Sequence, residues 1–279
     1  MTKIKDLLKL FHQQLSGFYP KEEIEAIFYR LIEYFYDIHK IDIVLNPNLK
    51  IEPTKLQDAL IRLVKYEPWQ YITGKTEFFG LSLSVNPAVL IPRPETEELV
   101  DWIIKENLHK EKLKILDIGT GSGAIAIGLA KNLSNANVYA VDYSEKALKI
   151  AQQNAMENKV SIHFIHQDIL DDFKSDDVFD IIVSNPPYVQ NSEKKLMKKN
   201  VLDYEPSSAL FAPDENPLIF YDKIINLFKK NTSEKGQLYF EINEFLKDHL
   251  EKLVINKGFE KYIFKKDIFE KWRMLKIFK

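Results

Sequence analysis

Apolar side chains in the first part of the chain recur at intervals of three and four residues. One series comprises Ile24, Ile27, Phe28, Leu31, Tyr34 and Phe35, and another comprises Leu56, Leu60, Leu63 and Val64. This spacing gathers apolar side chains on one stripe of an amphipathic helix, which is then buried against a neighbour. Residues 1–75 are therefore predicted to form a small bundle of helices.

Between residues 77 and 85 the pattern changes to an alternation of apolar and polar positions. Leu81, Leu83 and Val85 fall on one side of an extended chain, and the intervening serines fall on the other. Alternation with this period predicts a β-strand or a hairpin. Two prolines then interrupt the chain before residues 97–104, whose apolar pattern indicates a helix.

From residue 114 onward, short runs rich in Ile, Val, Tyr and Phe alternate with helical stretches. The predicted strands are 114–118, 137–141, 162–166, 179–184 and 237–242, and the predicted helices are 124–133, 144–157, 217–230 and 244–255. This alternation is typical of right-handed βαβ units, with a mainly parallel sheet covered by helices on both faces. The closing runs 262–264 and 274–278 are predicted to form a terminal hairpin. The fold class is therefore α/β.

Composition restricts the chemistry that this chain can perform. The absence of cysteine excludes disulfides, thiolate zinc sites and cysteine nucleophiles. His163 and His166 lie in a predicted strand, where a spacing of three residues places them on opposite faces, and the other four histidines are scattered, so no metal site is expected. Lys and Arg total 39 against 41 Asp and Glu, so the formal charge of −2 gives no support for stable DNA binding.

The distribution of apolar residues also bears on location. No apolar run approaches the ~20 residues that are needed to span a bilayer. Charged residues interrupt the first ten positions, which therefore lack the apolar stretch of a secretory signal. We expect a cytoplasmic protein with no membrane association.

A glycine-rich turn follows the first strand of the alternating region and leads into a helix. Its glycines, Gly119, Gly121 and Gly123, permit positive φ and let a ligand approach the backbone closely. Asp142 ends the next strand, where its carboxylate can accept hydrogen bonds from both hydroxyls of a ribose. Asp168 follows the third strand and can accept from an adenine amino group, although a turn residue is the simpler interpretation. This arrangement fits both a nicotinamide dinucleotide and S-adenosylmethionine.

The sequence Asn185-Pro186-Pro187-Tyr188 follows the fourth strand, at the edge where ligands bind in open α/β sheets. An amide or exocyclic amino nitrogen is a poor nucleophile because its lone pair is delocalised. Asn185 Oδ1 and the Pro186 carbonyl can accept its two hydrogens while the nitrogen is held in line with a methyl sulfonium. Tyr188 can stack on the flat group that is methylated. The alternative is a structural turn, since Asn-Pro and Pro-Pro are common in turns.

With these motifs, the sequence resembles the PrmC/HemK family of protein glutamine-N5 methyltransferases, which modify class 1 peptide chain release factors. The resemblance covers nearly the whole chain. Besides the glycine turn and residues 185–188, it includes Glu67–Gly74, Leu90–Glu97, Tyr204–Pro206 and Ala209–Leu210. The block from Pro92 to Glu97 is more specific than either methyltransferase motif, which many families share.

The resemblance implies a helical substrate-recognition domain at 1–75, a β-hairpin linker at 76–90 and a Rossmann-like seven-stranded methyltransferase domain at 91–279. It implies S-adenosyl-L-methionine as cofactor. The implied cofactor contacts are Gly119, Thr120, Gly121, Ser122, Gly123, Asp142, Asp168, Ile169 and Asn185. The implied substrate is the glutamine of the release factor Gly-Gly-Gln loop, with Asn185, Pro186 and Tyr188 catalytic and Asn185, Pro186, Pro187 and Tyr188 binding it. We expect a monomer.

Two other functions remain open at this point. An adenine-N6 methyltransferase that acts on DNA or RNA would also present Asn-Pro-Pro-Tyr to a planar NH₂ group. The net charge and the block from Pro92 to Glu97 favour glutamine over adenine. A non-catalytic cofactor-binding or assembly module is the second alternative, and the presence of Asn185 and Tyr188 argues against it. For Arg93, Glu95 and Glu97, the sequence leaves open a loop that closes over the site and simple helix capping.

Overall fold

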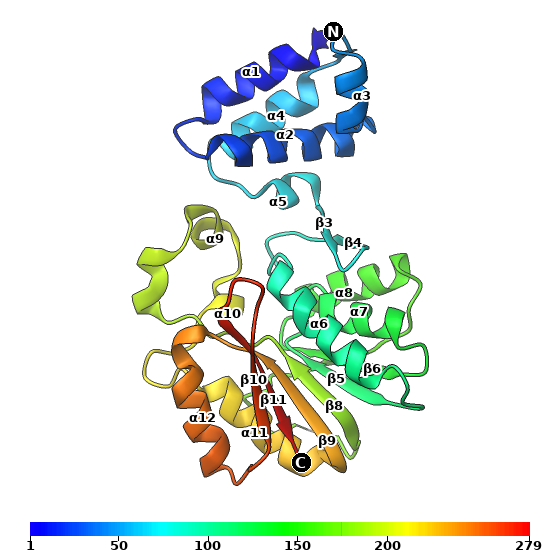
Figure 1. The fold of residues 1–279 in the computed structure, drawn as a ribbon, viewed down its shortest axis with the longest axis vertical. Coiled ribbons are helices and arrows are strands. Elements are labelled where there is room, and N and C mark those ends of the chain that lie inside the picture. Colours follow the sequence, from blue (N-terminus) through cyan, green and yellow to red (C-terminus); the bar gives the residue numbers. More distant parts are fainter. Residues whose placement is uncertain (174) are drawn as a thin grey trace. The chain divides into compact units, whose positions relative to one another are not determined.

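The computed structural model describes residues 1–173 and 175–279, and these residues divide into two compact units (Figure 1). One unit comprises Met1–Lys75 with Lys198–Tyr204, and the other comprises Thr76–Met197 with Glu205–Lys279. Within the described residues, no helix is both long and apolar enough to cross a membrane.

The first unit is built from short amphipathic helices. Its helices are α1 (Ile4–Leu15), α2 (Lys21–Tyr36), α3 (Lys40–Leu45), α4 (Thr54–Leu63), α5 (Trp69–Thr73) and α9 (Lys199–Tyr204), and β1 (Thr2–Lys3) pairs with β2 (Lys50–Ile51). The predicted stripes of α2 and α4 form the core, with one exception. Tyr34 is 49% exposed, whereas Ile32 is buried, because the buried face of α2 runs through Ile24, Phe28 and Ile32.

Helix α9 lies far along the chain from the other helices of this unit, in the range that the sequence assigned to the methyltransferase domain. Tyr204 Oη donates a hydrogen bond to the Lys65 carbonyl over 2.9 Å. Lys198 forms an ion pair of 3.3 Å with Glu23 at the start of α2. These contacts attach a segment of the second half of the sequence to the helical unit.

The second unit contains the predicted sheet. In its described part, seven strands lie in the order β10-β11-β9-β8-β5-β6-β7. Their bounds are β5 Lys114–Ile118, β6 Asn137–Asp142, β7 His163–His166, β8 Phe179–Ser184, β9 Thr232–Glu241, β10 Tyr262–Lys266 and β11 Trp272–Phe278. Strands β5 to β9 are parallel, and β11 runs antiparallel to β9 and β10. The Rossmann-like α/β fold and the terminal hairpin are thus confirmed.

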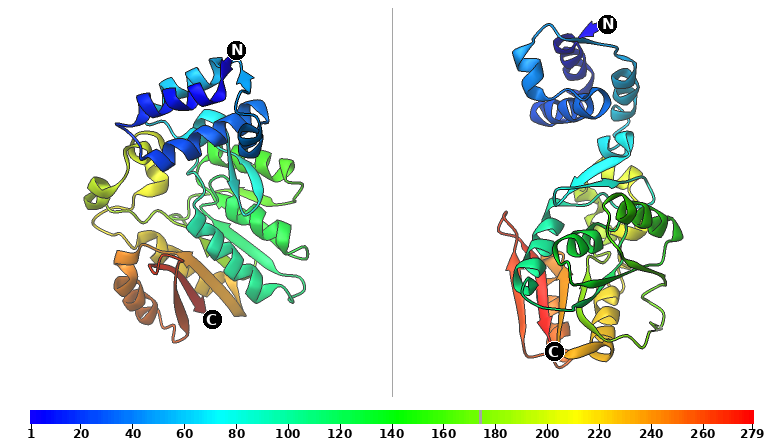
Figure 2. Two further views of the ribbon diagram at one scale, coloured as in Figure 1. Left: turned by 45° about the horizontal axis from the view of Figure 1, so that its top comes forward. Right: turned by 90° about the vertical axis from the view of Figure 1, so that its right-hand side faces the viewer.

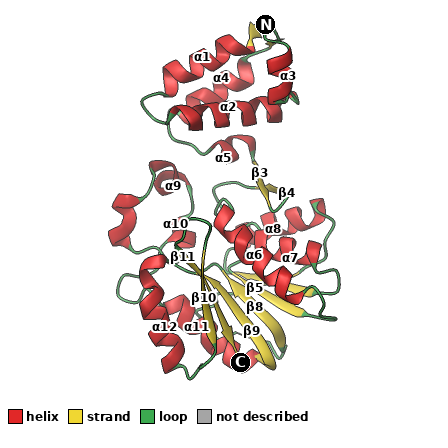
Figure 3. Ribbon diagram, viewed as in Figure 1, coloured by secondary structure: helices red, strands yellow, loops and turns green. Residues whose placement is uncertain are grey.

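Helices cover both faces of this sheet (Figures 1 and 2). Alternate residues of a strand point to opposite faces, and Ile115 and Ile181 enter one core, whereas Leu116 and Ile182 enter the other. The first core is shared with α6 (Pro94–Asn107), α7 (Ala124–Asn132) and α8 (Glu145–Glu157), and the second with α11 (Ile219–Asn231) and α12 (Lys247–Asn256). The remaining short helices are η1 (Asn191–Leu196), α10 (Ser207–Leu210) and η2 (Glu244–Leu246) (Figure 3).

The alternating segment forms the hairpin β3 (Lys75–Phe78) and β4 (Leu81–Ser84), as predicted. Its turn consists of Phe79 and Gly80, whose φ angles of 51° and 72° are both positive. This combination matches the right-handed twist of the two strands. The Phe79 amide donates to Glu97 Oε1 over 2.9 Å, so the turn is attached to α6.

Candidate active site

A cavity of about 880 Å³ lies where the parallel strands of the second unit end. It is lined by the predicted residues Gly119, Thr120, Gly121, Ser122, Asp142, Asp168, Ile169, Asn185, Pro186 and Pro187. Gly123 and Tyr188 are not among its described lining residues. Residues 86–90, which the sequence assigned to the linker, also line it. The volume is within the usual range for small-molecule sites.

The three glycines of the turn have positive φ angles for two different reasons. At Gly119 and Gly121, with φ of 72° and 55°, an added Cβ would meet nothing within 4 Å, so the backbone faces open space. At Gly123, with φ of 84°, a Cβ would lie 3.0 Å from Ile127 Cδ1 and 3.2 Å from Ala151 Cβ. Gly119 and Gly121 therefore expose backbone to the cavity, whereas Gly123 permits close packing of α7 against α8.

A buried carboxylate supports this turn. Asp117 lies in β5 with 0% exposure, and its Oδ2 accepts from Thr120 Oγ1 over 2.6 Å and from the Ala126 amide over 3.2 Å. Burial raises the pKa of Asp117 to about 7, although both hydrogen bonds act in the opposite direction. Asp117 was not predicted as a site residue. The sequence indication of a special role for Asp117 was that it is the only acidic residue in the otherwise apolar run Ile115–Ile118.

Asp142 is positioned as the sequence predicted, at the end of β6. Its Oδ2 accepts from the Gly121 amide and its Oδ1 from the Ser144 amide, both over 2.9 Å. Burial raises the pKa of Asp142, opposed by these backbone hydrogen bonds. Each carboxylate oxygen keeps a second lone pair that can accept from a ligand hydroxyl. Asp168 Oδ1 accepts from the Leu170 amide over 2.9 Å, so Asp168 is a turn residue that also lines the cavity.

The corner formed by residues 185–188 is fixed at both ends. Before it, Ser184 Oγ donates to the Ile118 carbonyl over 2.7 Å, which aligns the ends of β8 and β5. After it, the Val189 amide donates to the Leu210 carbonyl over 2.9 Å, and the Ala212 amide donates to the Val189 carbonyl over 3.0 Å. The corner therefore projects from a rigid frame.

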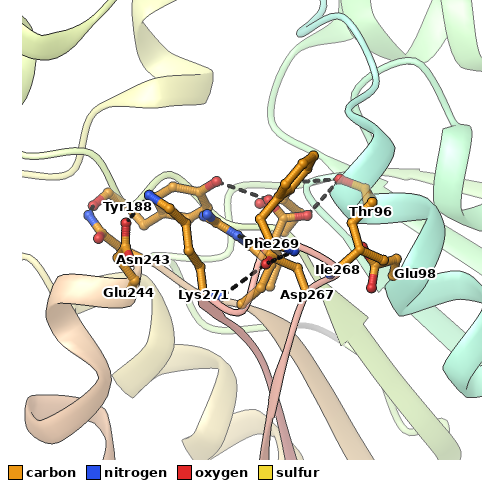
Figure 4. Close-up of polar contacts among 12 residues, drawn as sticks. Thr96, Glu98, Tyr188, Asn243, Glu244, Asp267, Ile268, Phe269 and Lys271 are labelled. Atoms are coloured by element: carbon orange, nitrogen blue, oxygen red, sulfur yellow. Dashed lines mark hydrogen bonds and ion pairs between the residues drawn. The ribbon is translucent and has the colours of Figure 1, made fainter.

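Side chains from two other segments, helix α6 and strand β9, contact this corner (Figure 4). Tyr188 Oη donates to Glu241 Oε1 over 2.9 Å, and Thr96 Oγ1 donates to Glu241 Oε2 over 2.6 Å. Asn185 Nδ2 donates to Thr96 Oγ1 over 3.4 Å. Neither Thr96 nor Glu241 was predicted as a site residue. For Glu241 the sequence indication was an acid inside the apolar run from Leu238 to Ile242.

The loop between β10 and β11 is ordered by Asp267 beside these residues (Figure 4). The Asp267 carboxylate accepts from the amides of Phe269 and Lys271 and from Arg273 Nε, over 2.9, 3.0 and 3.2 Å. The Ile268 amide donates to Glu98 Oε1 of α6 over 3.2 Å. The C-terminal hairpin is thus fastened to the same helix that carries Thr96.

The block from Pro92 to Glu97 attaches the start of α6 to its surroundings. Arg93 pairs with the buried Glu205 over 2.6 Å, and Glu205 also accepts from the Ile91 amide over 3.1 Å. Arg93 occupies the N-cap position of α6 but makes no side-chain capping bond. Glu97 holds the β3–β4 turn. Arg93 and Glu97 therefore form noncovalent contacts between segments that lie apart in the sequence: an ion pair for Arg93 and a hydrogen bond for Glu97.

Comparison with known proteins adds the decisive observation. A family model described as the methyltransferase small domain matches residues 99–204. A release factor glutamine methyltransferase from Flavobacterium psychrophilum is 51% identical, covering 98% of each chain. Its counterpart from Bacteroides thetaiotaomicron is 44% identical, covering 94% of this chain and 95% of its own. The chain belongs to the release factor glutamine methyltransferase family.

More distant solved structures show the same fold. The Thermus thermophilus 16S rRNA N2 G1207 methyltransferase (RsmC), in complex with AdoMet and guanosine, aligns with a TM-score of 0.54 and 19% identity, covering 74% of this chain and 49% of its own. The catalytic domain of human Mettl16 aligns with a TM-score of 0.55 and 17% identity, covering 71% and 76%. The second unit of this family member therefore has a methyltransferase fold.

Replacing Gly123 by alanine tests its packing role. We expect Gly123→Ala to lower the free energy of unfolding by ~2 to 5 kcal/mol, because left-handed backbone strain adds to a clash with Ile127 and Ala151. Gly258→Ala is the matched control, since Gly258 has a φ of 83° and its Cβ would meet only Lys229 Nζ at 4.0 Å. Denaturant unfolding of both variants measures the difference. Equal losses would show that packing at Gly123 contributes nothing.

The raised pKa of Asp117 predicts a pH dependence of stability. The folded state binds this proton more tightly than the unfolded state, so the contribution is complete below about pH 4 and is lost as the pH rises through about 7. Asp117→Asn should therefore flatten the decline in Tm between about pH 4 and about pH 7. The partly exposed Asp101→Asn is the control. An unchanged slope in Asp117→Asn would contradict the prediction.

Proposed function

We propose that this chain methylates the side-chain amide nitrogen, N5, of the glutamine in the Gly-Gly-Gln motif of class 1 peptide chain release factors, with S-adenosyl-L-methionine as methyl donor. The observation that carries the proposal is the position of Asn185 and Pro186, which line the same cavity as the glycine turn. Relatives that match 98% and 94% of the chain are named release factor glutamine methyltransferases, which supports this substrate over adenine.

The residues around the cavity fit S-adenosyl-L-methionine. Gly119 and Gly121 leave space where any other residue would place a Cβ, so the backbone can lie against a ligand. Asp142 offers two hydrogen-bonded carboxylate oxygens with lone pairs for the two ribose hydroxyls. When bound, the cofactor supplies an electrophilic methyl group on its sulfonium. Asp168 and Ile169 are proposed to lie near the adenine.

The chain's own contribution is to hold a weakly nucleophilic nitrogen. Asn185 Oδ1 and the Pro186 carbonyl are proposed to accept the two hydrogens of the glutamine amide, which keeps its lone pair directed at the methyl group. Orientation of this kind supplies ~7 to 11 kcal/mol in favourable intramolecular cases. Because the two prolines restrict the corner and its ends are hydrogen-bonded, little freedom is lost when substrate binds. Pro187 and Tyr188 complete the proposed substrate contacts.

The other sequence predictions depend on further experiments. Recognition of the release factor by the helical unit is part of the proposal. The monomeric state, the cytoplasmic location and the lack of stable DNA binding stay predictions. Stacking of the Tyr188 ring on the substrate amide also stays a prediction, because the contact that the structure shows for Tyr188 is the hydrogen bond from its hydroxyl to Glu241.

The role of Asp142 can be measured without any protein substrate. Asp142→Ala removes the acceptors for the ribose hydroxyls, and charge-assisted hydrogen bonds contribute ~1.5 to 3 kcal/mol each. We therefore expect cofactor affinity to fall by roughly tenfold or more in calorimetry. Asp180→Ala, a change on β8 outside the cavity lining, is the control. Unchanged affinity in Asp142→Ala would refute the ribose assignment.

The proposed reaction is tested with S-adenosyl-L-methionine labelled in its methyl group. We expect label on an intact release factor, none on its Gly-Gly-Ala variant, and none on adenine-containing DNA or RNA. Asn185→Ala should abolish transfer while cofactor binding stays measurable, because it removes an acceptor for the substrate hydrogens. Label on nucleic acid would instead favour the adenine-N6 activity. Near-normal turnover by Asn185→Ala would refute the assigned mechanism.

A further inference from the structure

The carboxylate of Glu241 is a deeply buried charged group beside the corner at residues 185–188. Only 1% of the residue is exposed, at the carboxyl end of β9. Its two oxygens accept from different hydroxyls, Thr96 in the first turn of α6 and Tyr188 in the corner, over 2.6 and 2.9 Å. One carboxylate thus connects strand β9, helix α6 and the corner at residues 185–188. Figure 4 labels its two partners, Thr96 and Tyr188.

The direction of these hydrogen bonds decides how the Asn185 amide faces. An ionised carboxylate can only accept, and a hydroxyl has a single hydrogen to donate. Because the Thr96 hydrogen is given to Glu241, Thr96 Oγ1 can only accept from its next neighbour. Asn185 Nδ2, 3.4 Å away, is that neighbour. The amide nitrogen therefore faces Thr96, and Oδ1 remains for another donor.

We propose that Glu241 is a positioning residue for methyl transfer, which acts through Thr96 to keep Asn185 Oδ1 directed at the hydrogens of the substrate amide. A flipped Asn185 would present its NH₂ group to the substrate NH₂ group, so that two donors would face each other and neither would be satisfied. The inference rests on the proposed function for the identity of that substrate. The orientation of Asn185 is a property of this chain alone.

A purely structural role does not require an acid at this position. Burial raises the pKa of Glu241, and hydrogen bonds from Thr96 and Tyr188 and the charge of Arg273 oppose this effect, so the ionised form carries a desolvation cost. A neutral side chain could join α6 to β9 at a lower cost. What only a carboxylate supplies is acceptance at both oxygens, which fixes the direction of both hydroxyls. That property is needed where the orientation of Asn185 determines the reaction.

Three variants of the full-length chain separate this role from packing. Thr96→Val removes the acceptor for Asn185 Nδ2 and should lower kcat about tenfold or more, equivalent to ~1.4 kcal/mol. Thr96→Ser keeps the hydroxyl and should recover most of that loss. Glu241→Gln should also lower kcat, because the NH₂ group of glutamine would face one of the two hydroxyls, which then loses its acceptor. In Thr96→Val and Glu241→Gln, KM for the release factor and affinity for the cofactor should change much less than kcat.

A double variant and a control distinguish a positioning role from a general loss of stability. Glu241→Gln combined with Thr96→Val should lose little more kcat than Thr96→Val alone, since both changes interrupt one chain of hydrogen bonds. Glu106→Gln is the matched control, because Glu106 lies on the same helix α6 and accepts from Tyr239, Trp102 and Lys276. It should lower Tm with little effect on kcat. Additive losses, or an equal kcat loss in Glu106→Gln, would overturn the proposal.

An NMR measurement tests the orientation without any methylation assay. The Asn185 side-chain NH₂ should give a nuclear Overhauser contact to the Thr96 methyl group in the wild type, and this contact should weaken in Glu241→Gln. Asn185→Asp identifies the resonance. If the wild type shows no such contact, the inference fails even when release factor is labelled. If the contact is present but release factor is not labelled, the proposed substrate fails and the orientation stands.

Discussion

The candidate site depends on carboxylates that are buried at or close to the ends of strands and that accept hydrogen bonds from hydroxyl and amide groups of the surrounding loops. Burying an ionised carboxylate without partners is prohibitively costly, so each acid requires its donors to stay in place. Asp117 binds Thr120 of the glycine turn, Asp142 binds Gly121, and Glu241 binds Thr96 and Tyr188. Removing any one of these acids would therefore remove hydrogen bonds that hold the loops around the cavity and the corner at residues 185–188 in place.

This arrangement explains how a cavity built mostly from loops can be rigid. Strands β5, β6 and β8 are parallel and end at the same edge of the sheet, but residues 119–123, 143–144 and 185–188, which follow them, share no helix or strand that could hold them together. The buried carboxylate of Glu205 holds the segment before α6 in the same way, because it accepts a hydrogen bond from the Ile91 amide and forms an ion pair with Arg93. Rigid placement matters for the proposed mechanism, in which catalysis comes mainly from orienting a poor nucleophile rather than from acid–base chemistry.

The periodic features of the sequence predicted the fold closely, and the site only in part. Strand β5, the hairpin β3–β4 and the positions of Asp142 and Asn185 followed from local pattern, because each depends on residues adjacent in the chain. The contacts of Thr96 with Glu241 join residues far apart in sequence, and only the folded sheet brings them together. The attachment of α9 to the helical unit was missed for the same reason.

Gly123 and Gly121 show why a motif alone does not assign roles. Both glycines have positive φ and belong to the same turn, yet an added Cβ at one would enter open space and at the other would strike α7 and α8. The spacing of the glycines does not show what each one accommodates. At Gly123 neighbouring helices leave no room for a side chain, whereas at Gly121 a Cβ would take up cavity space proposed for the cofactor. A substitution can therefore damage stability at one glycine and ligand binding at the other, although the sequence presents them as equivalent.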